Sequence, residues 1–186
     1  MDFLDEVSVI GSTEQRRRIF AHPFDPRYRA LDVKRLREAV AGLAAVIDTA
    51  AVDYVLGFPV GGIIPALAFA EIADRPLIVS MLLEPEQPGA IRFEEPHSVV
   101  APVHYIQGLR PGERVVIIED EVTTGRTAVN AVRALRAAGV RVGDVGALLV
   151  VDHPSVWARF AAAEVALHAC VKLPPAYGAA IAGPAT

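Results

Sequence analysis

The sequence predicts a single α/β domain with a central, mostly parallel sheet and helices on both faces. Short, continuously apolar segments alternate with segments whose apolar residues recur every three or four positions, as in buried strands and their covering helices. The chain has 186 residues, of which 53% are hydrophobic, and this suits one domain with a sizeable core. Ligands of such sheets bind beyond the carboxyl ends of the strands, so we expect functional residues in the turns there.

Five apolar segments are the expected strands. They read "DYVLGF", "PLIVSMLL", "VVII", "VGALLVVD" and "VALHACVKL". Four segments are the expected helices. The first covers residues 32–49 with Asp32 as its N-cap, and the second follows a glycine loop within residues 59–74. The third follows Gly125 and ends near Gly139, and the fourth is "PSVWARFAAAE".

Two segments lack such a pattern. Residues 1–30 mix arginine, proline and aromatic residues, and we expect an irregular N-terminal arm. Residues 84–110 are rich in proline, glycine and glutamate, which predicts a mobile loop that can include a hairpin.

Composition excludes several classes of function. A net charge of −4 argues against nucleic-acid binding, and no apolar run reaches the length of a membrane span. The N-terminus lacks the apolar stretch of a signal peptide, so a cytoplasmic protein is expected. A single cysteine excludes an internal disulfide and a cysteine-rich zinc site. His22, His104, His153 and His168 show no metal-ligand spacing.

The segment "VVIIEDEVTTGRT", residues 115–127, points most directly to chemistry. A strand runs into Glu119 and Asp120, and a threonine and glycine turn then opens an amphipathic helix. Free N–H groups and the dipole at a helix N-terminus favour an anion, so this turn is a candidate phosphate cup. The carboxylates would repel a bare phosphate. They suit a sugar phosphate, whose hydroxyls they can bind and whose cationic transition state they can stabilise.

This segment resembles the phosphoribosyl pyrophosphate (PRPP) signature of type I phosphoribosyltransferases: an apolar strand, two acids, two variable residues, then Thr/Asp-Thr-Gly-x-Thr. A weaker resemblance covers about residues 30–155 and is closest in layout to the adenine and orotate branches. "VLGFPVGGIIPALAFA" resembles the pyrophosphate loop of the family, although an ordinary tight turn also explains its glycines. The resemblance implies the type I phosphoribosyltransferase fold, with a small hood formed by residues 1–30.

The resemblance also implies roles for individual residues. Glu119 and Asp120 would be catalytic and would hold the ribose hydroxyls, with Asp120 nearest the reacting sugar. The 5-phosphate would be wrapped by Thr123, Thr124, Gly125, Arg126 and Thr127. Pyrophosphate would bind to backbone groups of Val60, Gly61 and Gly62, and a strained or cis peptide in this loop is one way to present them.

A metal and a quaternary state follow from the same resemblance. Mg²⁺ would be held mainly by the substrate, with Glu119 and Asp120 as candidate protein ligands, and would act as a Lewis acid on the leaving group. Homodimers are common in the family, so a homodimer is expected. "VVD" at residues 150–152 resembles a strand end that often faces the acceptor, which makes Asp152 a candidate acceptor contact.

The sequence departs from the family in the loop after "PLIVSMLL". Adenine and orotate enzymes usually carry lysine or Arg-Lys clusters there, whereas residues 84–98 contain no lysine and one arginine, Arg92, among four glutamates. We expect a lid in which Arg92 turns inward, or arginines from residues 16–18 and 27–29 of a neighbouring subunit reach over. A solvated or subunit-contact surface is the alternative role for those arginines. His97 is either a base, a substrate contact or a residue without a role.

The predicted function is Mg²⁺-dependent transfer of 5-phosphoribosyl from PRPP to a nitrogenous acceptor, with release of pyrophosphate. The acceptor would be a purine, a pyrimidine or a specialised heterocycle or amine, the last favoured by the acidic loop. One alternative is a non-catalytic regulator of the same fold that senses PRPP. Another is a phosphorylase or hydrolase that uses the same sugar-phosphate site.

The phosphate cup leads to a first testable prediction. Losing a hydrogen bond to a charged group costs about 1.5–3 kcal/mol, so Thr127→Ala should weaken the binding of PRPP with Mg²⁺ by roughly tens-fold. Isothermal titration calorimetry would measure this affinity. Absence of binding by the wild type at millimolar PRPP would contradict the cup itself.

Overall fold

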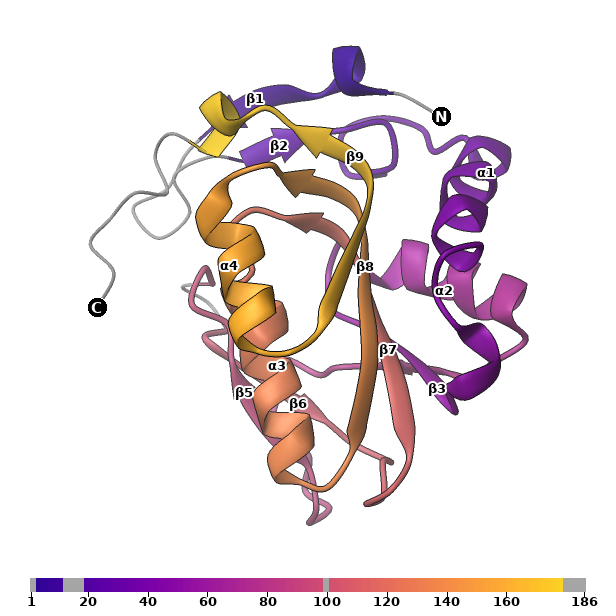
Figure 1. Ribbon diagram of the computed structural model, residues 1–186, viewed down its shortest axis with the longest axis vertical. Coiled ribbons are helices and arrows are strands. Elements are labelled where there is room, and N and C mark those ends of the chain that lie inside the picture. Colours follow the sequence, from indigo (N-terminus) through magenta and orange to yellow (C-terminus); the bar gives the residue numbers. More distant parts are fainter. Residues whose placement is uncertain (1–2, 12–18, 99–100, 179–186) are drawn as a thin grey trace.

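The computed structural model describes residues 3–11, 19–98 and 101–178, and its centre is a five-stranded parallel sheet (Figure 1). The strand order is β4-β3-β7-β8-β9, and neighbouring strands all pair in parallel. The strands are β3 (Tyr54–Gly57), β4 (Leu77–Val79), β7 (Arg114–Val122), β8 (Arg141–Val151) and β9 (Ala166–Leu173). This sheet and its covering helices confirm the predicted fold class.

Helices cover both faces of the sheet (Figure 1). They are α1 (Val33–Ala44), α2 (Ile63–Ala73), α3 (Arg126–Ala137) and α4 (Pro154–Ala162). The central strand β7 shows why the apolar runs are continuous. Val116 and Ile118 pack with residues of α1 and α2, whereas Val115 and Ile117 pack with residues of α3 and α4. Both faces of β7 are therefore buried, as a parallel sheet between two helical layers requires.

The first helix begins as the sequence predicts and ends earlier. The Asp32 carboxylate accepts a hydrogen bond from the Arg35 backbone N–H at 3.1 Å, which confirms the expected N-cap. The helix stops at Ala44 instead of continuing to residue 49, because the β-branched residues that follow have lower helix propensity. Ile47 is nevertheless buried in the core, and this explains the extended periodic signal.

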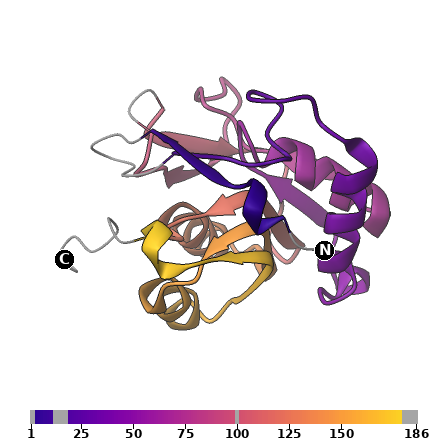
Figure 2. The same cartoon turned by 90° about the horizontal axis from the view of Figure 1, so that it is seen from above.

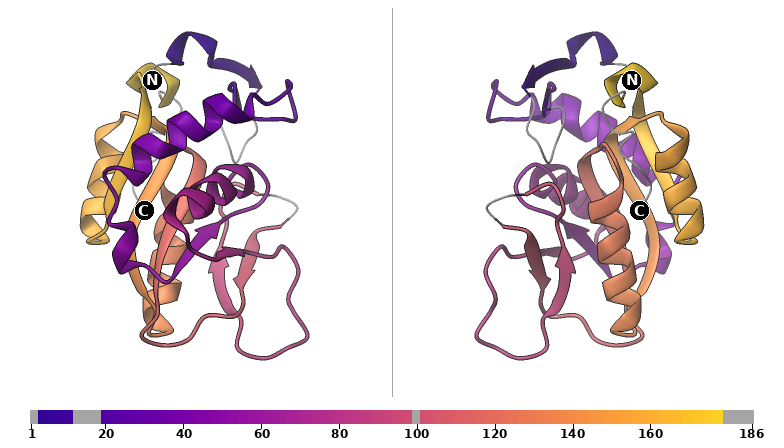
Figure 3. Two further views of the ribbon diagram at one scale, coloured as in Figure 1. Left: turned by 90° about the vertical axis from the view of Figure 1, so that its right-hand side faces the viewer. Right: turned by 90° about the vertical axis from the view of Figure 1, so that its left-hand side faces the viewer.

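The N-terminal arm is more regular than the sequence predicts. After a short 3₁₀ helix, η1 (Leu4–Glu6), strands β1 (Ser8–Gly11) and β2 (Ile19–Ala21) pair antiparallel. Strands of three or four residues are too short for their alternation to be recognised in the sequence. Figures 1 and 3 show the pair at the carboxyl ends of β7 and β8, and Figure 2 looks down on it.

A second antiparallel pair lies within residues 84–110. Strands β5 (Ile91–Glu94) and β6 (Val103–Ile106) form a separate two-stranded sheet beside α3, where the Asn130 side chain donates to the Glu94 carbonyl at 3.1 Å. The expected strand "PLIVSMLL" is shorter than predicted because Met81 pairs with Tyr105 of β6 instead of continuing β4. Mobility of this segment stays a prediction.

The helices in the described part of the chain do not combine the length and the apolar character that crossing a bilayer requires.

The packing of β9 against α1 gives a prediction about the single cysteine. The Cys170 thiol donates to the Ala39 carbonyl at 3.2 Å, and burial raises its pKa from 9.0 to about 11. Because the thiolate is the reactive form, the folded chain at pH 8 should react with Ellman's reagent about a hundredfold more slowly than the urea-unfolded chain. Equal rates in both states would contradict this packing.

Candidate active site

A cleft of about 380 Å³ lies where β3 and β7 leave the sheet. Four segments line it: the loop after β3, the end of β7 with its turn, the region around the β5–β6 hairpin, and the N-terminal arm. Their lining residues are Phe58, Pro59, Val60, Gly61, Gly62, Leu82, Glu95, His97, Ser98, Ala101, His104, Glu119, Asp120, Glu121, Val122, Thr123, Thr124, Gly125, Thr127, Ala128 and Arg27.

The turn after β7 presents the start of α3 to the cleft. Gly125 precedes the helix with φ of +74°, and a Cβ there would lie 2.5 Å from the Phe160 ring. Only glycine therefore fits both the backbone conformation and the space. Thr123, Thr124 and Thr127 all line the cleft beside it. Threonine residues and the start of α3 thus face the same cleft, an arrangement that suits a bound anion.

An arginine of α4 holds this turn in place. The guanidinium of Arg159, on α4, donates to the Thr124 carbonyl. Burial lowers the pKa of Arg159, and the neighbouring charges of Arg126 and Arg133 lower it further. These three positive charges lie close enough to interact, so they add a favourable potential for an anion in the turn. Arg159 could not be identified from the sequence, because it lies 35 residues after Thr124 in a helix whose pattern indicates only packing.

The loop after β3 fits closely against the carboxylates of β7. The Pro59–Val60 peptide is cis, and Gly61 and Gly62 follow it. A Cβ on Gly61 would lie 1.8 Å from Asp120 Oδ2, and one on Gly62 would lie 2.7 Å from Glu119 Oε2. Side chains at these two positions would displace the acids, so the two glycines permit the loop backbone to approach them.

The three acids at the end of β7 differ in exposure. Glu119 is buried, with 8% of its surface exposed, while Asp120 and Glu121 are partly exposed to the cleft. The structure therefore brings the predicted catalytic pair and the predicted pyrophosphate loop to the same place. Glu121, which the family pattern treats as variable, lines the cleft as a third carboxylate.

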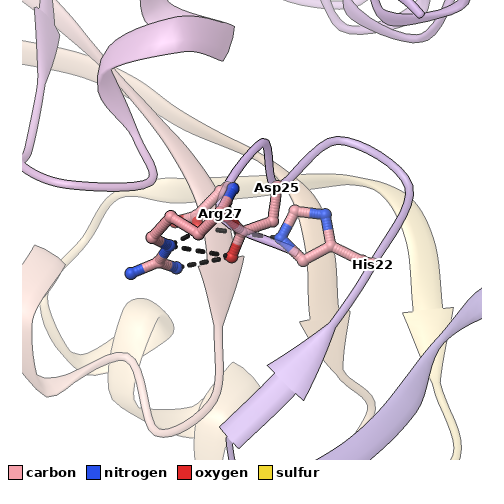
Figure 4. Close-up of polar contacts among 4 residues, drawn as sticks. His22, Asp25 and Arg27 are labelled. Carbon is pink, nitrogen blue, oxygen red and sulfur yellow. Dashed lines mark hydrogen bonds and ion pairs between the residues drawn. The ribbon is translucent and has the colours of Figure 1, made fainter. Parts of the chain in front are cut away.

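The N-terminal arm adds a cation to this acidic cleft. Arg27 donates to Asp25 through Nε at 2.8 Å and Nη2 at 2.6 Å, and Figure 4 shows the two side chains facing each other. Burial alone would raise the pKa of Asp25, but the hydrogen bonds and charge of Arg27 outweigh it and lower that pKa. Hydrogen bonding to Asp25 raises the pKa of Arg27, and the Asp120 charge contributes.

The arginines expected to act from a neighbouring subunit have different positions. Arg27 lines the cleft of its own chain, and Arg29 pairs with Glu6 at 3.3 Å. Arg16, Arg17 and Arg18 lie outside the described residues. Phe24 of the same arm is buried against Phe3, with 4.7 Å between the ring centroids, and is not part of the cleft lining.

The hairpin region contacts the turn at residues 123–127 directly. His97 Nε2 lies 2.6 Å from Thr124 Oγ1, and the His97 backbone N–H donates to Glu95 Oε1 at 2.7 Å. Among the loop glutamates Glu84, Glu86, Glu94 and Glu95, only Glu95 lines the cleft. The loop thus presents a single carboxylate to a ligand, which is much less repulsive than its composition suggests.

Three candidate residues lie outside the cleft lining. Arg92 is exposed on β5, because the alternation of the strand turns Phe93 inward. The Arg126 side chain is exposed, although its backbone N–H donates to Thr124 Oγ1 at 3.2 Å. Asp152 accepts a hydrogen bond from Trp157 Nε1 at 2.7 Å.

The contact between the glycine loop and Asp120 gives a prediction with an internal control. Gly61→Ala should displace the Asp120 carboxylate and weaken PRPP binding by about tenfold or more, since hydrogen bonds to a charged group are lost. Gly42→Ala is the control, because a Cβ on this α1 residue would meet no atom within 4 Å. Calorimetry and thermal melting would compare both variants. Wild-type affinity in Gly61→Ala would contradict the proposed role of this contact.

Comparison with known proteins places this geometry in a family. Residues 77–176 match the family model described as phosphoribosyl transferase. A hypoxanthine/guanine phosphoribosyltransferase of Methanospirillum hungatei is 26% identical over 137 residues, 74% of this chain and 75% of the relative. One of Ferroglobus placidus is 30% identical over 125 residues, 67% and 66% of the two chains.

Solved structures share the fold at lower identity. Adenine phosphoribosyltransferase from Thermoanaerobacter pseudethanolicus aligns with a TM-score of 0.73 and 15% identity, over 91% of this chain and 96% of that one. Orotate phosphoribosyltransferase from Aeropyrum pernix aligns with a TM-score of 0.60 and 19% identity, over 90% and 89%. Because the family model covers more than half of the sequence, this chain belongs to the phosphoribosyl transferase family.

Proposed function

We propose that the chain is a phosphoribosyltransferase that moves 5-phosphoribosyl from PRPP to a purine base and releases pyrophosphate in the cleft at β3 and β7. The observation that carries the proposal is the meeting of three segments in one cleft: the threonine turn, the glycine loop and the carboxylates of β7. Each matches one part of PRPP, namely its 5-phosphate, its pyrophosphate and its ribose. The comparisons give no support to the alternative of a non-catalytic regulator.

The 5-phosphate would bind in the turn at residues 123–127. There the N–H groups at the start of α3 and the threonine hydroxyls would donate to its oxygens. Arg159 would hold the turn through the Thr124 carbonyl. His97 lies beside the Thr124 hydroxyl and would bring an imidazole from the hairpin region close to the phosphate.

The ribose and the pyrophosphate would meet across the contact between the glycine loop and β7. Glu119 and Asp120 would accept hydrogen bonds from the ribose hydroxyls, and Asp120 would stabilise positive charge that develops on the sugar as pyrophosphate leaves. These carboxylates beside an open backbone loop are hard oxygen donors that fit Mg²⁺, which keeps most of its ligands from water and phosphates. When bound there, Mg²⁺ would polarise the leaving pyrophosphate.

The choice of a purine acceptor rests on relatives and on the lining of the cleft. The curated relatives named above are hypoxanthine/guanine phosphoribosyltransferases, and several structural neighbours are adenine phosphoribosyltransferases. Outside the PRPP segments, the cleft offers a carboxylate, Glu95, and a guanidinium, Arg27. A 6-oxopurine carries N–H donors for the first and a carbonyl acceptor for the second. Because Glu95 is the only one of the four loop glutamates in the lining, the loop gives less reason to prefer a cationic amine as acceptor.

We also propose that the protein is a homodimer in the cytoplasm. The dimer is proposed because homodimers are common in the resembled family, and sedimentation equilibrium of the purified chain would test it.

The role of Asp120 is tested by Asp120→Asn. The amide can still contact ribose hydroxyls but cannot stabilise a cationic sugar, so kcat should fall roughly a hundredfold or more while PRPP affinity changes little. Pyrophosphate release would be measured with hypoxanthine, guanine, adenine, orotate and no acceptor. Asp144→Asn, which lies outside the cleft lining, is the control.

Each outcome of this assay has a definite reading. A near-normal kcat in Asp120→Asn would remove Asp120 from its proposed role. Pyrophosphate release without any acceptor would favour a hydrolase, and no release with any acceptor would contradict the proposed function.

A further inference from the structure

His22 lies directly after β2 and is fully buried, with 0% of its surface exposed. Among the residues that the structure describes, neither of its ring nitrogens has a hydrogen-bond partner. A buried polar group without a partner costs about 1–3 kcal/mol, so such groups in native proteins call for an explanation. The nearby Asp25 carboxylate does not supply one, because its hydrogen bonds go to Arg27 (Figure 4).

The ring points to the carboxylates at the end of β7. His22 Nε2 lies 3.7 Å from Asp120 Oδ2, which is too long for a hydrogen bond. One ligand atom each from His22, Asp120 and Glu121 lies within 4.8 Å of the other two. Metal–ligand bonds of about 2.0–2.2 Å place ligand atoms around one ion roughly 3–4.4 Å apart. The three side chains therefore need only small adjustments to share an ion.

We propose that His22, Asp120 and Glu121 form a binding site for a divalent transition-metal ion of the Mn²⁺ or Zn²⁺ type. The ligand set selects this class. Two carboxylates alone would suit Mg²⁺, but an imidazole nitrogen favours first-row transition metals. The ion would satisfy the buried ring and offset the repulsion between two neighbouring carboxylates. Water would fill the remaining positions on the side of the cleft.

The site differs from the Mg²⁺ position expected with pyrophosphate. It draws a ligand from the N-terminal arm and uses Glu121 in place of Glu119, so it would fasten the arm to the end of β7. Asp120 is shared by both positions. One consequence rests on the proposed function: because both positions use Asp120, the transition metal and PRPP would change each other's affinity by the same factor.

The test measures metal binding alone, without PRPP or acceptor. The full chain, freed of metal by a chelator and dialysed, would be titrated with MnCl₂, ZnCl₂ and MgCl₂ in a calorimeter. We expect one Mn²⁺ or Zn²⁺ ion per chain and much weaker binding of Mg²⁺. His22→Gln and Glu121→Gln should each weaken Mn²⁺ and Zn²⁺ binding at least tenfold, since each removes a direct ligand.

A second histidine–carboxylate pair provides matched controls. His168 Nε2 lies 3.0 Å from Asp144 Oδ2 between β8 and β9, and neither residue lines the cleft. His168→Gln and Asp144→Asn should leave the calorimetric titration unchanged. Electron paramagnetic resonance of bound Mn²⁺ would confirm that the ion occupies one ordered site in the wild type and not in Glu121→Gln.

Several results would overturn the proposal. These are no stoichiometric Mn²⁺ or Zn²⁺ binding by the wild type, or unchanged affinity in both cleft variants. If circular dichroism shows that His22→Gln does not fold, the affinity of Glu121→Gln for Mn²⁺ and Zn²⁺ decides instead, because Glu121 is partly exposed. A separate titration with PRPP and Mg²⁺ keeps the two ideas apart, because failure of PRPP binding would leave the transition-metal result intact.

Discussion

The close approach of the Gly61–Gly62 backbone to the carboxylates at the end of β7 is the contact on which the rest of the site depends. It requires the absence of two side chains, because a Cβ at either position would fall within 3 Å of a carboxylate oxygen. It also requires that β3 and β7 be adjacent and parallel, so that both turns leave the same edge of the sheet. Because β7 is buried on both faces, it is a central strand of the sheet, and its acids lie where the strand leaves the core.

The turn at residues 123–127 depends on the same strand, β7, and on the helical layer that contains α4. Gly125 has no room for a Cβ because Phe160 of α4 packs against it, and Arg159, one residue earlier, holds the Thr124 carbonyl. One short helix therefore shapes the turn both by packing and by charge. Positive charge from Arg159 and donors from the backbone would therefore allow the proposed phosphate to bind in a turn that lacks the lysine of a nucleotide-binding P-loop.

The sequence could predict whatever is encoded in a continuous segment. The strands, the four helices and the PRPP signature each lie within about a dozen neighbouring residues, and the structure contains all of them. Contacts that depend on folding were out of reach: Arg159 meets Thr124, and His22 meets Asp120, across long separations. The β1–β2 pair was missed because such short strands carry too little alternation. Composition was also a poor guide: four loop glutamates suggested a strongly acidic lid, but only one of them, Glu95, lines the cleft.

The cleft contains more negative than positive side chains, in keeping with a chain that has only two lysines, Lys34 and Lys172. Four carboxylates line the cleft, from Glu95, Glu119, Asp120 and Glu121. Among the described residues, Arg27 is the only arginine in the lining, and it is already paired with Asp25. At an effective dielectric near 20, two like charges about 4 Å apart repel by roughly 4 kcal/mol. A bare pyrophosphate would therefore be disfavoured, whereas a divalent cation bound to it would reduce the repulsion and would itself be attracted by the same acids. The composition of this cleft therefore suits the proposed substrate best when its pyrophosphate carries a divalent cation.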